Sequence, residues 1–116
     1  MQRQDSNDRI QTVSADTFDE SILRGVGPIV VEFMSYSCAH CRVLEPNIQR
    51  VAEMVGPEEK IFRVNIATDQ ELAGAYAIEG TPTLIMFLNG EVVGRDEGPG
   101  PSVSNILSVV RQPYGS

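Results

Sequence analysis

Runs of apolar residues along the chain predict a buried sheet. The segment 29–34 (IVVEFM) is almost continuously apolar and rich in β-branched residues, which is typical of a central strand covered on both faces. Shorter runs of the same kind predict further strands at 10–13, 61–65, 83–88 and 91–94. The last two strands flank Asn89-Gly90, a strong hairpin signal, so we expect them to be antiparallel neighbours.

Helical spacing of apolar residues predicts a helix after each of the first three strands and another at the end. Leu44, Ile48 and Val51 recur at this spacing and predict a helix over 38–55 that kinks at Pro46 and continues beyond it. Other helices are predicted over 15–24, 69–77 and after a Ser102 cap. The order βαβαβαββα predicts an α/β fold, in which a central mixed five-stranded sheet is flanked by helices on both faces.

Both ends of the chain lack this periodicity. Residues 1–9 are polar and predict a flexible N-terminal tail, and residues 113–116 predict a frayed C-terminal tail. A single domain over 10–112 remains, which is long enough to bury a hydrophobic core. We expect neither tail to carry chemistry.

The charge and hydropathy of the chain limit which partners and which cellular location we expect. The net charge is −7 and the nine basic residues are scattered, which argues against binding to nucleic acid or to a membrane. No apolar run approaches the roughly 20 residues of a membrane span, and the first residues lack the apolar stretch of a secretory signal. We therefore expect a cytoplasmic protein, although a mature fragment of a longer chain would begin in the same way.

The two cysteines of the chain stand together as Cys38-Ala39-His40-Cys41. They follow the predicted central strand, at the sheet edge where α/β proteins place their sites. At the start of a helix, Cys38 lies at the positive end of the helix dipole, and such surroundings lower a thiol pKa from about 8.5 to roughly 3.5–7.5. Cys38 is therefore the predicted nucleophile, and the more buried Cys41 is the predicted resolving thiol of a redox disulfide.

A metal site, a structural disulfide and a pair of inert thiols are weaker interpretations of these cysteines. A zinc site needs four ligands, whereas the chain offers two cysteines and one histidine, so we predict no metal and no other cofactor. A structural disulfide that closes so small a loop adds little stability. Two inert cysteines would occur at a strand–CxxC–helix junction only by chance, and this placement is typical of redox motifs.

Further segments accompany the cysteine pair at specific spacings. They are 31–33 (VEF), Pro46 five residues after Cys41, and 76–84 (YAIEGTPTL) followed by Asn89-Gly90. With these motifs the chain resembles the thioredoxin family from about residue 10 to residue 111. It departs from the family's Trp-Cys-Gly-Pro-Cys, because it has Ser37 before the cysteine motif and no tryptophan. The form Cys-x-His-Cys is more similar to disulfide isomerases and bacterial disulfide oxidases.

The resemblance implies a substrate-binding surface beside the cysteines. It implies a cis peptide bond between Thr81 and Pro82 that lies against the cysteine pair, whereas an ordinary trans-proline turn is the alternative. The backbone at Thr81 would pair with an extended substrate segment, and Gly98 matches the other side of that groove. Ala39, within the cysteine motif, belongs to the same expected surface.

The resemblance also implies roles for three charged or titratable residues. Glu32 matches a buried acid, and with Val31 and Phe33 around it we expect a raised pKa and a role as proton acceptor from Cys41. Arg63 matches a basic neighbour that would oppose this shift, although simple surface charges remain the alternative for both residues. His40 would stabilise the Cys38 thiolate and make the disulfide more oxidising, or stand exposed without redox influence.

The implied function is that of a thiol:disulfide oxidoreductase. It would reduce disulfides of protein substrates through Cys38 and Cys41, act as a monomer, and be recharged by a reductase or another thiol electron donor. Two alternatives remain open. One is a disulfide oxidase or isomerase, which His40 and Thr81 favour, and the other is a binding or holdase module that uses the same groove without turnover.

Overall fold

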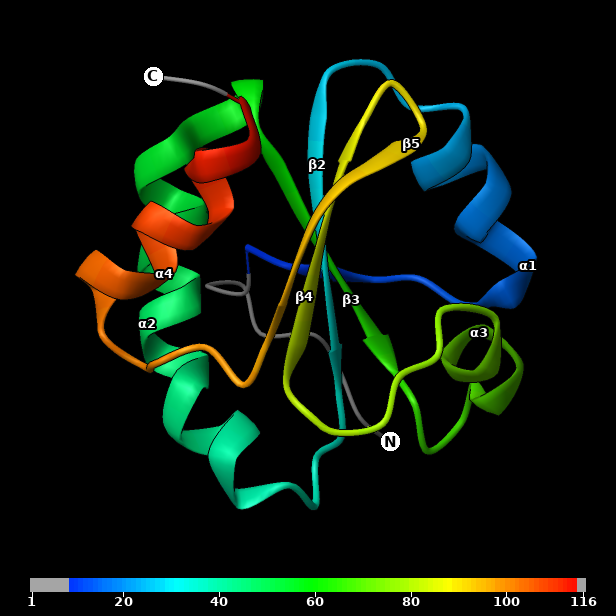
Figure 1. Ribbon diagram of the computed structural model, residues 1–116, viewed down its shortest axis with the longest axis horizontal. Coiled ribbons are helices and arrows are strands. Elements are labelled where there is room, and N and C mark those ends of the chain that lie inside the picture. The colour runs from blue at the N-terminus through cyan, green and yellow to red at the C-terminus, as the bar shows by residue number, and fades with distance from the viewer. Residues whose placement is uncertain (1–8, 115–116) are drawn as a thin grey trace.

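A five-stranded sheet with the order β1-β3-β2-β4-β5 forms the centre of the molecule (Figure 1). The computed structural model describes residues 9–114. The strands are β1 (Gln11–Thr12), β2 (Pro28–Met34), β3 (Lys60–Asn65), β4 (Thr83–Leu88) and β5 (Glu91–Glu97). Since β1, β3 and β2 run parallel whereas β4 and β5 run antiparallel to their neighbours, the predicted mixed sheet is confirmed.

Helices cover both faces of this sheet. They are α1 (Ala15–Phe18), α2 (Ala39–Val55), α3 (Gln70–Ala75) and α4 (Val103–Arg111), with short turns of other helix types in η1 (Asp19–Leu23), η2 (Gly56–Glu58) and η3 (Gln112–Tyr114). Helices α2 and α4 lie on one face and α1 and α3 on the other (Figure 1). The helix predicted over 15–24 is α-helical only in its first turn, whereas α2 runs past Pro46 as predicted.

Two strands differ from their predicted lengths by more than one residue. The first is only two residues long, but its flanking residues Ile10 and Val13 are buried as expected of that segment. The last extends to Glu97 rather than ending at residue 94, because it continues to pair with β4 as far as Thr83. This extension brings the chain after β5 to the edge of the sheet where β2 ends.

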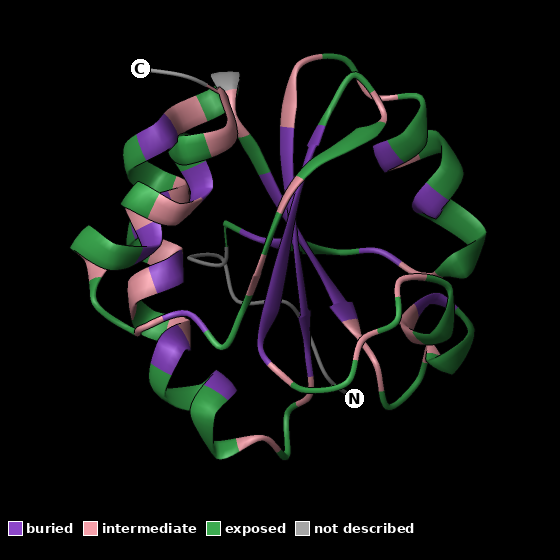
Figure 2. Ribbon diagram, viewed as in Figure 1, coloured by how far each residue is buried: buried purple, intermediate pink, exposed green. Residues whose placement is uncertain are grey.

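Alternate side chains of β2 belong to different hydrophobic clusters, one on each face of the sheet. Val30 packs in the cluster with α2 and α4, whereas Val31 and Phe33 pack in the cluster with α1 and α3. Figure 2 shows that β2, β3 and β4 are buried over most of their length. Glu32 is two residues from Val30 and therefore faces α2, on the same side of the sheet as this hydrophobic cluster.

The chain after α4 packs against the sheet. The hydroxyl of Tyr114 lies 3.2 Å from the carbonyl oxygen of Ile29 and 3.0 Å from that of Phe87, and its ring contacts the cluster beneath α2 and α4. The predicted tail over 113–116 is therefore wrong for its first two residues, because this one phenol connects η3 to two strands. Residues 115 and 116, and residues 1–8 of the predicted N-terminal tail, lie outside the described residues.

We predict that Tyr114→Phe lowers the free energy of unfolding by about 1 kcal/mol, because a half-buried hydroxyl loses its shared hydrogen bond while the ring keeps its packing. Chemical denaturation measures the change. Tyr36→Phe is the matched control, since Tyr36 is 59% exposed and its substitution should leave stability within about 0.5 kcal/mol. Equal effects of the two substitutions would contradict the prediction.

Candidate active site

Cys38 is the N-cap residue of α2. Its backbone is extended, its N–H donates to the carbonyl oxygen of Ser35 at 3.1 Å, and its sulfur accepts the N–H of Cys41 at 3.1 Å. The first N–H groups of a helix have no partner within the helix and carry its positive partial charge. The sulfur of Cys38 therefore occupies the position at which an anion is most stabilised.

The two thiols have opposite environments. Cys38 is half-buried, whereas Cys41 is 2% exposed. Partial burial raises the pKa of Cys38, but hydrogen bonds with the Cys41 thiol, the Thr81 side chain and the N–H groups of Cys41 and His40 outweigh it and lower the pKa below its ordinary value. Burial, together with the hydrogen bond to Cys38, raises the pKa of Cys41 to about 11. One sulfur is thus the better thiolate, and the other keeps its proton.

Of the residues expected to bind substrate, Thr81 contacts Cys38, and Gly98 is joined to the same loop through Pro82. The Thr81–Pro82 peptide bond is cis, so the trans-proline alternative is wrong. The Cys38 thiol donates to the carbonyl oxygen of Thr81 at 3.5 Å, and the N–H of Gly98 donates to that of Pro82 at 2.8 Å. Ala39, directly after Cys38, is exposed. The cis-proline loop, the end of β5 and the start of α2 therefore meet at the reactive sulfur.

Glu32 is fully buried, and the alternative of a carboxylate facing water is wrong. Burial and the nearby negative charge of Glu45 raise its pKa to about 8, and the positive charge of Arg63 opposes this shift. The raised pKa was predicted, but its expected cause was incomplete. Val31 and Phe33 point to the other face of the sheet, so the carboxyl is desolvated by the cluster beneath α2 rather than by its sequence neighbours.

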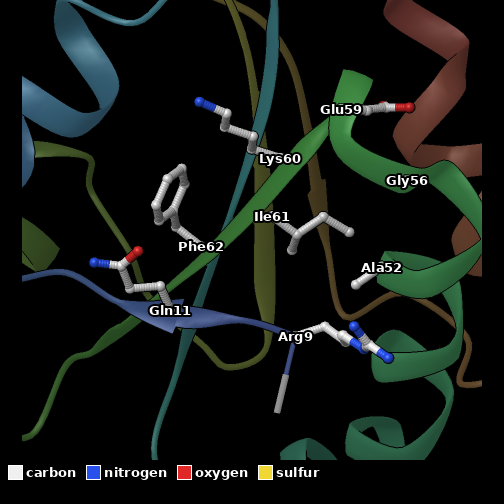
Figure 3. Close-up of a pocket in the computed structure, with 8 residues that line it drawn as sticks. All are labelled: Arg9, Gln11, Ala52, Gly56, Glu59, Lys60, Ile61 and Phe62. Atoms are coloured by element: carbon white, nitrogen blue, oxygen red, sulfur yellow. The ribbon is translucent and has the colours of Figure 1, made fainter. Parts of the chain in front are cut away.

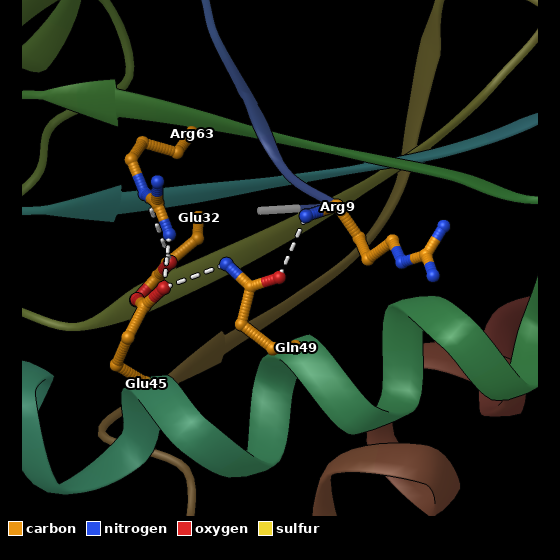
Figure 4. A network of polar contacts seen from close by, with 5 residues as sticks. All are labelled: Arg9, Glu32, Glu45, Gln49 and Arg63. Atoms are coloured by element: carbon orange, nitrogen blue, oxygen red, sulfur yellow. Dashed lines mark hydrogen bonds and ion pairs between the residues drawn. The ribbon is translucent and has the colours of Figure 1, made fainter. Parts of the chain in front are cut away.

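Arg63 lies directly beside Glu32, because the two are register partners on parallel strands. It is only 3% exposed, so the surface-charge alternative is wrong for this residue as well. Its Nε is 4.0 Å from Oε1 of Glu32, while its Nη2 donates to Oε2 of Glu45 at 2.5 Å. Figure 4 shows the guanidinium facing both carboxylates, one from β2 and one from α2.

Glu45 was missed from the sequence, although a signal was present. It follows Cys41 by four residues and Leu44 by one, which places it next to the buried stripe of α2 and on the side of the resolving thiol. Because α2 covers the buried Glu32, an acid at this position of the helix lies close enough for the charges of the two acids to interact. Only the packing of α2 on the sheet reveals that Arg63 reaches it.

His40 is exposed on the first turn of α2. Its contribution to the lowered pKa of Cys38 comes from the backbone N–H rather than from the imidazole. Among the described residues, no three histidine, cysteine or acidic side chains are grouped closely enough to hold a metal ion. The reactive side chains that the structure places at this end of α2 and beneath it are two thiols and a buried carboxyl.

A separate hollow lies at the opposite end of the sheet (Figure 3). Arg9, Gln11, Glu59 and Lys60 line it, together with residues near the end of α2. In the parallel pair of β2 and β3, Lys60 is level with the start of β2, whereas the cysteines follow its end. This hollow contains none of the predicted site residues and is distinct from the cysteine site.

A sequence profile of the family described as Thioredoxin matches residues 9–112. The chain belongs to the thioredoxin family. It is 32% identical to a thioredoxin of Rickettsia bellii over 68% of this chain and 75% of that protein, and 29% identical to a thioredoxin of Rhodospirillum rubrum over 79% and 88%. It is also 29% identical to a probable protein disulfide-isomerase A6 of Medicago sativa, over 92% of this chain.

Coverage differs among these thioredoxin-family relatives. The chain spans 30% of the length of the Medicago protein and 47% of a chloroplastic thioredoxin M2 of Arabidopsis thaliana.

In the described part of the chain, every helix is too short or too polar to span a bilayer. The predicted fold class is confirmed by the family match together with the mixed sheet and its two helical layers.

We predict that iodoacetamide at neutral pH modifies Cys38 at least about tenfold faster than Cys41, because the thiolate is the reactive form. The rate at Cys38 should rise with pH around a midpoint below that of an ordinary cysteine thiol, because the pKa of Cys38 is lowered. Peptide mass spectrometry after timed quenching measures both sites. The control is the denatured protein, in which the two sites should react at similar rates, and similar rates in the folded protein would contradict the prediction.

We predict that Glu32→Gln becomes progressively more stable than the wild type as pH rises. The carboxyl of Glu32 is protonated in both states below pH 4.5 and ionised in both above about pH 8, so between these values the unfolded chain alone releases its proton and the folded state loses stability. The difference should grow by about 3 to 5 kcal/mol across this window, at about 1.4 kcal/mol per pKa unit.

Denaturant unfolding of the oxidised proteins at a series of pH values measures this difference without thiol titration. Glu20→Gln removes an exposed carboxylate from η1 and is the matched control, for which we expect no such trend. A Glu32→Gln curve parallel to that of the wild type would show that Glu32 titrates normally.

Proposed function

We propose that this chain is a thiol:disulfide oxidoreductase that reduces disulfides of other proteins through Cys38 and Cys41. The observation that carries the proposal is the asymmetry of the two thiols at the start of α2: the accessible sulfur has the lowered pKa and the buried one the raised pKa. Membership of the thioredoxin family supports the same chemistry.

In the proposed reaction the Cys38 thiolate attacks one sulfur of a substrate disulfide. A Cys38–substrate disulfide forms, and the other substrate sulfur leaves as a thiolate that takes a proton from water. Cys41 then loses its proton and attacks the sulfur of Cys38, which releases the second substrate thiolate. Two electrons pass to the substrate, and Cys38 and Cys41 end as a disulfide.

We propose Glu32 as the group that takes the proton of Cys41. A carboxyl whose pKa is about 8 can accept and return a proton near neutral pH, whereas an ordinary glutamate is too weak a base. The charges of Glu32 and Cys38 interact, because the negative charge of Cys38 contributes to the raised pKa of Glu32. Arg63 is a modulating residue through its own charge.

Substrate would be held by backbone contacts around Cys38. The half-buried Thr81 presents its main chain beside the sulfur, and Pro82, Gly98 and Ala39 surround the same point. An extended segment that pairs with the backbone of Thr81 would bring its disulfide within reach of Cys38. Recognition through main-chain groups suits a protein that acts on several substrates.

A disulfide oxidase or isomerase is the second candidate, and two observations favour it. The motif contains His40, and one relative carries the name of a protein disulfide-isomerase. The reduction potential decides between the candidates, because a potential well above that of the cytosolic glutathione pool favours oxidation of substrates. Equilibration with glutathione buffers, followed by alkylation, measures it.

The electron donor, the monomeric state and the cytoplasmic location belong to the same proposal. A reductase or a small thiol would return electrons to the Cys38–Cys41 disulfide. The named relatives include two bacterial thioredoxins and a chloroplastic one, so the cytoplasmic location stays a prediction.

We predict that catalytic amounts of the protein accelerate the reduction of insulin by dithiothreitol and that Cys38→Ser abolishes this acceleration, because it removes the attacking sulfur. Cys41→Ser should accumulate a mixed disulfide with insulin, since that intermediate can no longer resolve. Turbidity and non-reducing gels measure the two effects.

Met54→Ser is the matched control, because it removes an exposed sulfur from the far end of α2 and should keep full activity. Identical turbidity curves for the wild type and Cys38→Ser would contradict the reductase proposal and favour a binding or holdase module. A trapped adduct in Cys41→Ser that survives reductant would contradict a disulfide linkage.

A further inference from the structure

Glu45 is the central member of a polar network that runs from the buried Glu32 to Arg9 (Figure 4). Its side chain is 35% exposed, and Oε2 accepts hydrogen bonds from Arg63 at 2.5 Å and from Gln49 at 2.8 Å. Oε1 of Gln49 in turn accepts the backbone N–H of Arg9 at 2.7 Å. Glu45 is thus held in one place by two side chains, one of which is anchored to the segment before β1.

The position of the guanidinium favours Glu45 over Glu32. Arg63 makes a short charged hydrogen bond to Glu45, whereas its nearest approach to Glu32 is the 4.0 Å contact of Nε with Oε1. Within the part of the chain that the structure describes, neither carboxyl oxygen of Glu32 accepts a hydrogen bond. A cation that could form a close pair with Glu32 is therefore directed to a second carboxylate.

The consequence for Glu32 follows from the sum of charges. Arg63 contacts two carboxyl groups, so ionisation of Glu32 adds a second negative charge beside this one positive charge, in a region where solvent screens little. Glu45 acts twice, since it repels the developing charge and weakens the field of Arg63 at Glu32. Removal of the charge of Glu45 would end both effects on Glu32, while the positive charge of Arg63 would remain beside it.

Among the described neighbours of Glu32, no further charged group would explain the effect on its carboxyl that we ascribe to Glu45 and Arg63. Its partner on β4 is the apolar Leu84, and the residues of α4 that pack in the same cluster are apolar. Helix α2 contributes Glu45 and the two thiols, of which Cys38 acts on Glu32 through its charge. Strand β3 contributes Arg63.

We propose that Glu45 is a positioning residue, which draws Arg63 away from Glu32 and so sets the pH range in which Glu32 takes the proton of Cys41. This proposal rests on the proposed role of Glu32 in resolution, but its first part concerns only the charge network. The network raises the pH at which the carboxyl of Glu32 ionises, and only the ionised form can accept the proton of Cys41.

Glu45→Gln tests the proposal with little change of shape. The amide oxygen can still accept a hydrogen bond from Arg63, so only the negative charge is removed. In the oxidised protein, where neither thiol titrates, ¹³C NMR of the carboxyl carbons measures the proton affinity of Glu32 directly, and Glu32→Gln assigns its signal. We expect the midpoint in Glu45→Gln to fall by at least about 1 pH unit, a tenfold loss of proton affinity.

Two further variants show whether the shift of the midpoint is specific to the charge of Glu45. Glu45→Asp keeps the charge and should restore a midpoint close to that of the wild type. Glu53→Gln removes a charge from the exposed face of the same helix, eight residues further on, and should leave the midpoint unchanged. Thermal unfolding confirms that each variant is folded. An unchanged midpoint in folded Glu45→Gln, or an equal shift in Glu53→Gln, would overturn the proposal.

The second part of the proposal, the effect of Glu45 on the resolution step, is measured separately. The pH dependence of resolution, measured as release of a thiol from a preformed Cys38 mixed disulfide in single turnover, should move to lower pH in Glu45→Gln by the same amount as the titration. A titration shift without this movement would overturn the link to resolution. Failure of the proposed function is recognised separately, because wild-type protein would then not reduce insulin, and the titration would still decide whether Glu45 controls Glu32.

Discussion

The hydrogen bond from the N–H of Cys41 to the sulfur of Cys38 links the chemistry of this protein to its fold. It makes the reactive sulfur the cap of α2, so the longest helix of the described chain begins at the point where its positive end is needed. The same turn places the second sulfur one helical turn inside, where it is buried. A single local feature therefore produces two thiols of different acidity.

Tertiary structure adds what the helix cannot supply by itself. The cis-proline loop brings the carbonyl oxygen of Thr81 to the sulfur of Cys38, and Gly98 holds that loop through Pro82. Beneath the helix, Glu32 has its desolvated carboxyl on the face of the sheet that α2 covers. The accessible side of the cysteine pair thus has main-chain groups beside it, and the buried side has a carboxyl beneath it.

Charges inside the core are arranged so that desolvation, rather than pairing, governs Glu32. A buried acid beside a buried arginine would ordinarily form a close pair, and its pKa would fall. Here Arg63 also serves Glu45, and the pKa of Glu32 stays high at about 8. Ionisation of Glu32 in the folded protein is therefore disfavoured by its surroundings.

The sequence by itself determined the order of elements, the mixed sheet and the cysteine pair at a helix start, because apolar periodicity, the Asn89-Gly90 turn and the CxxC spacing are local signals. The resemblance of 76–84 to the thioredoxin family added the cis proline. Only the tertiary structure decided that Tyr114 joins the core and that Glu45 shares Arg63 with Glu32, because both depend on contacts between segments distant along the chain. Side-chain partners across layers follow from how helices pack on the sheet, which no local pattern specifies.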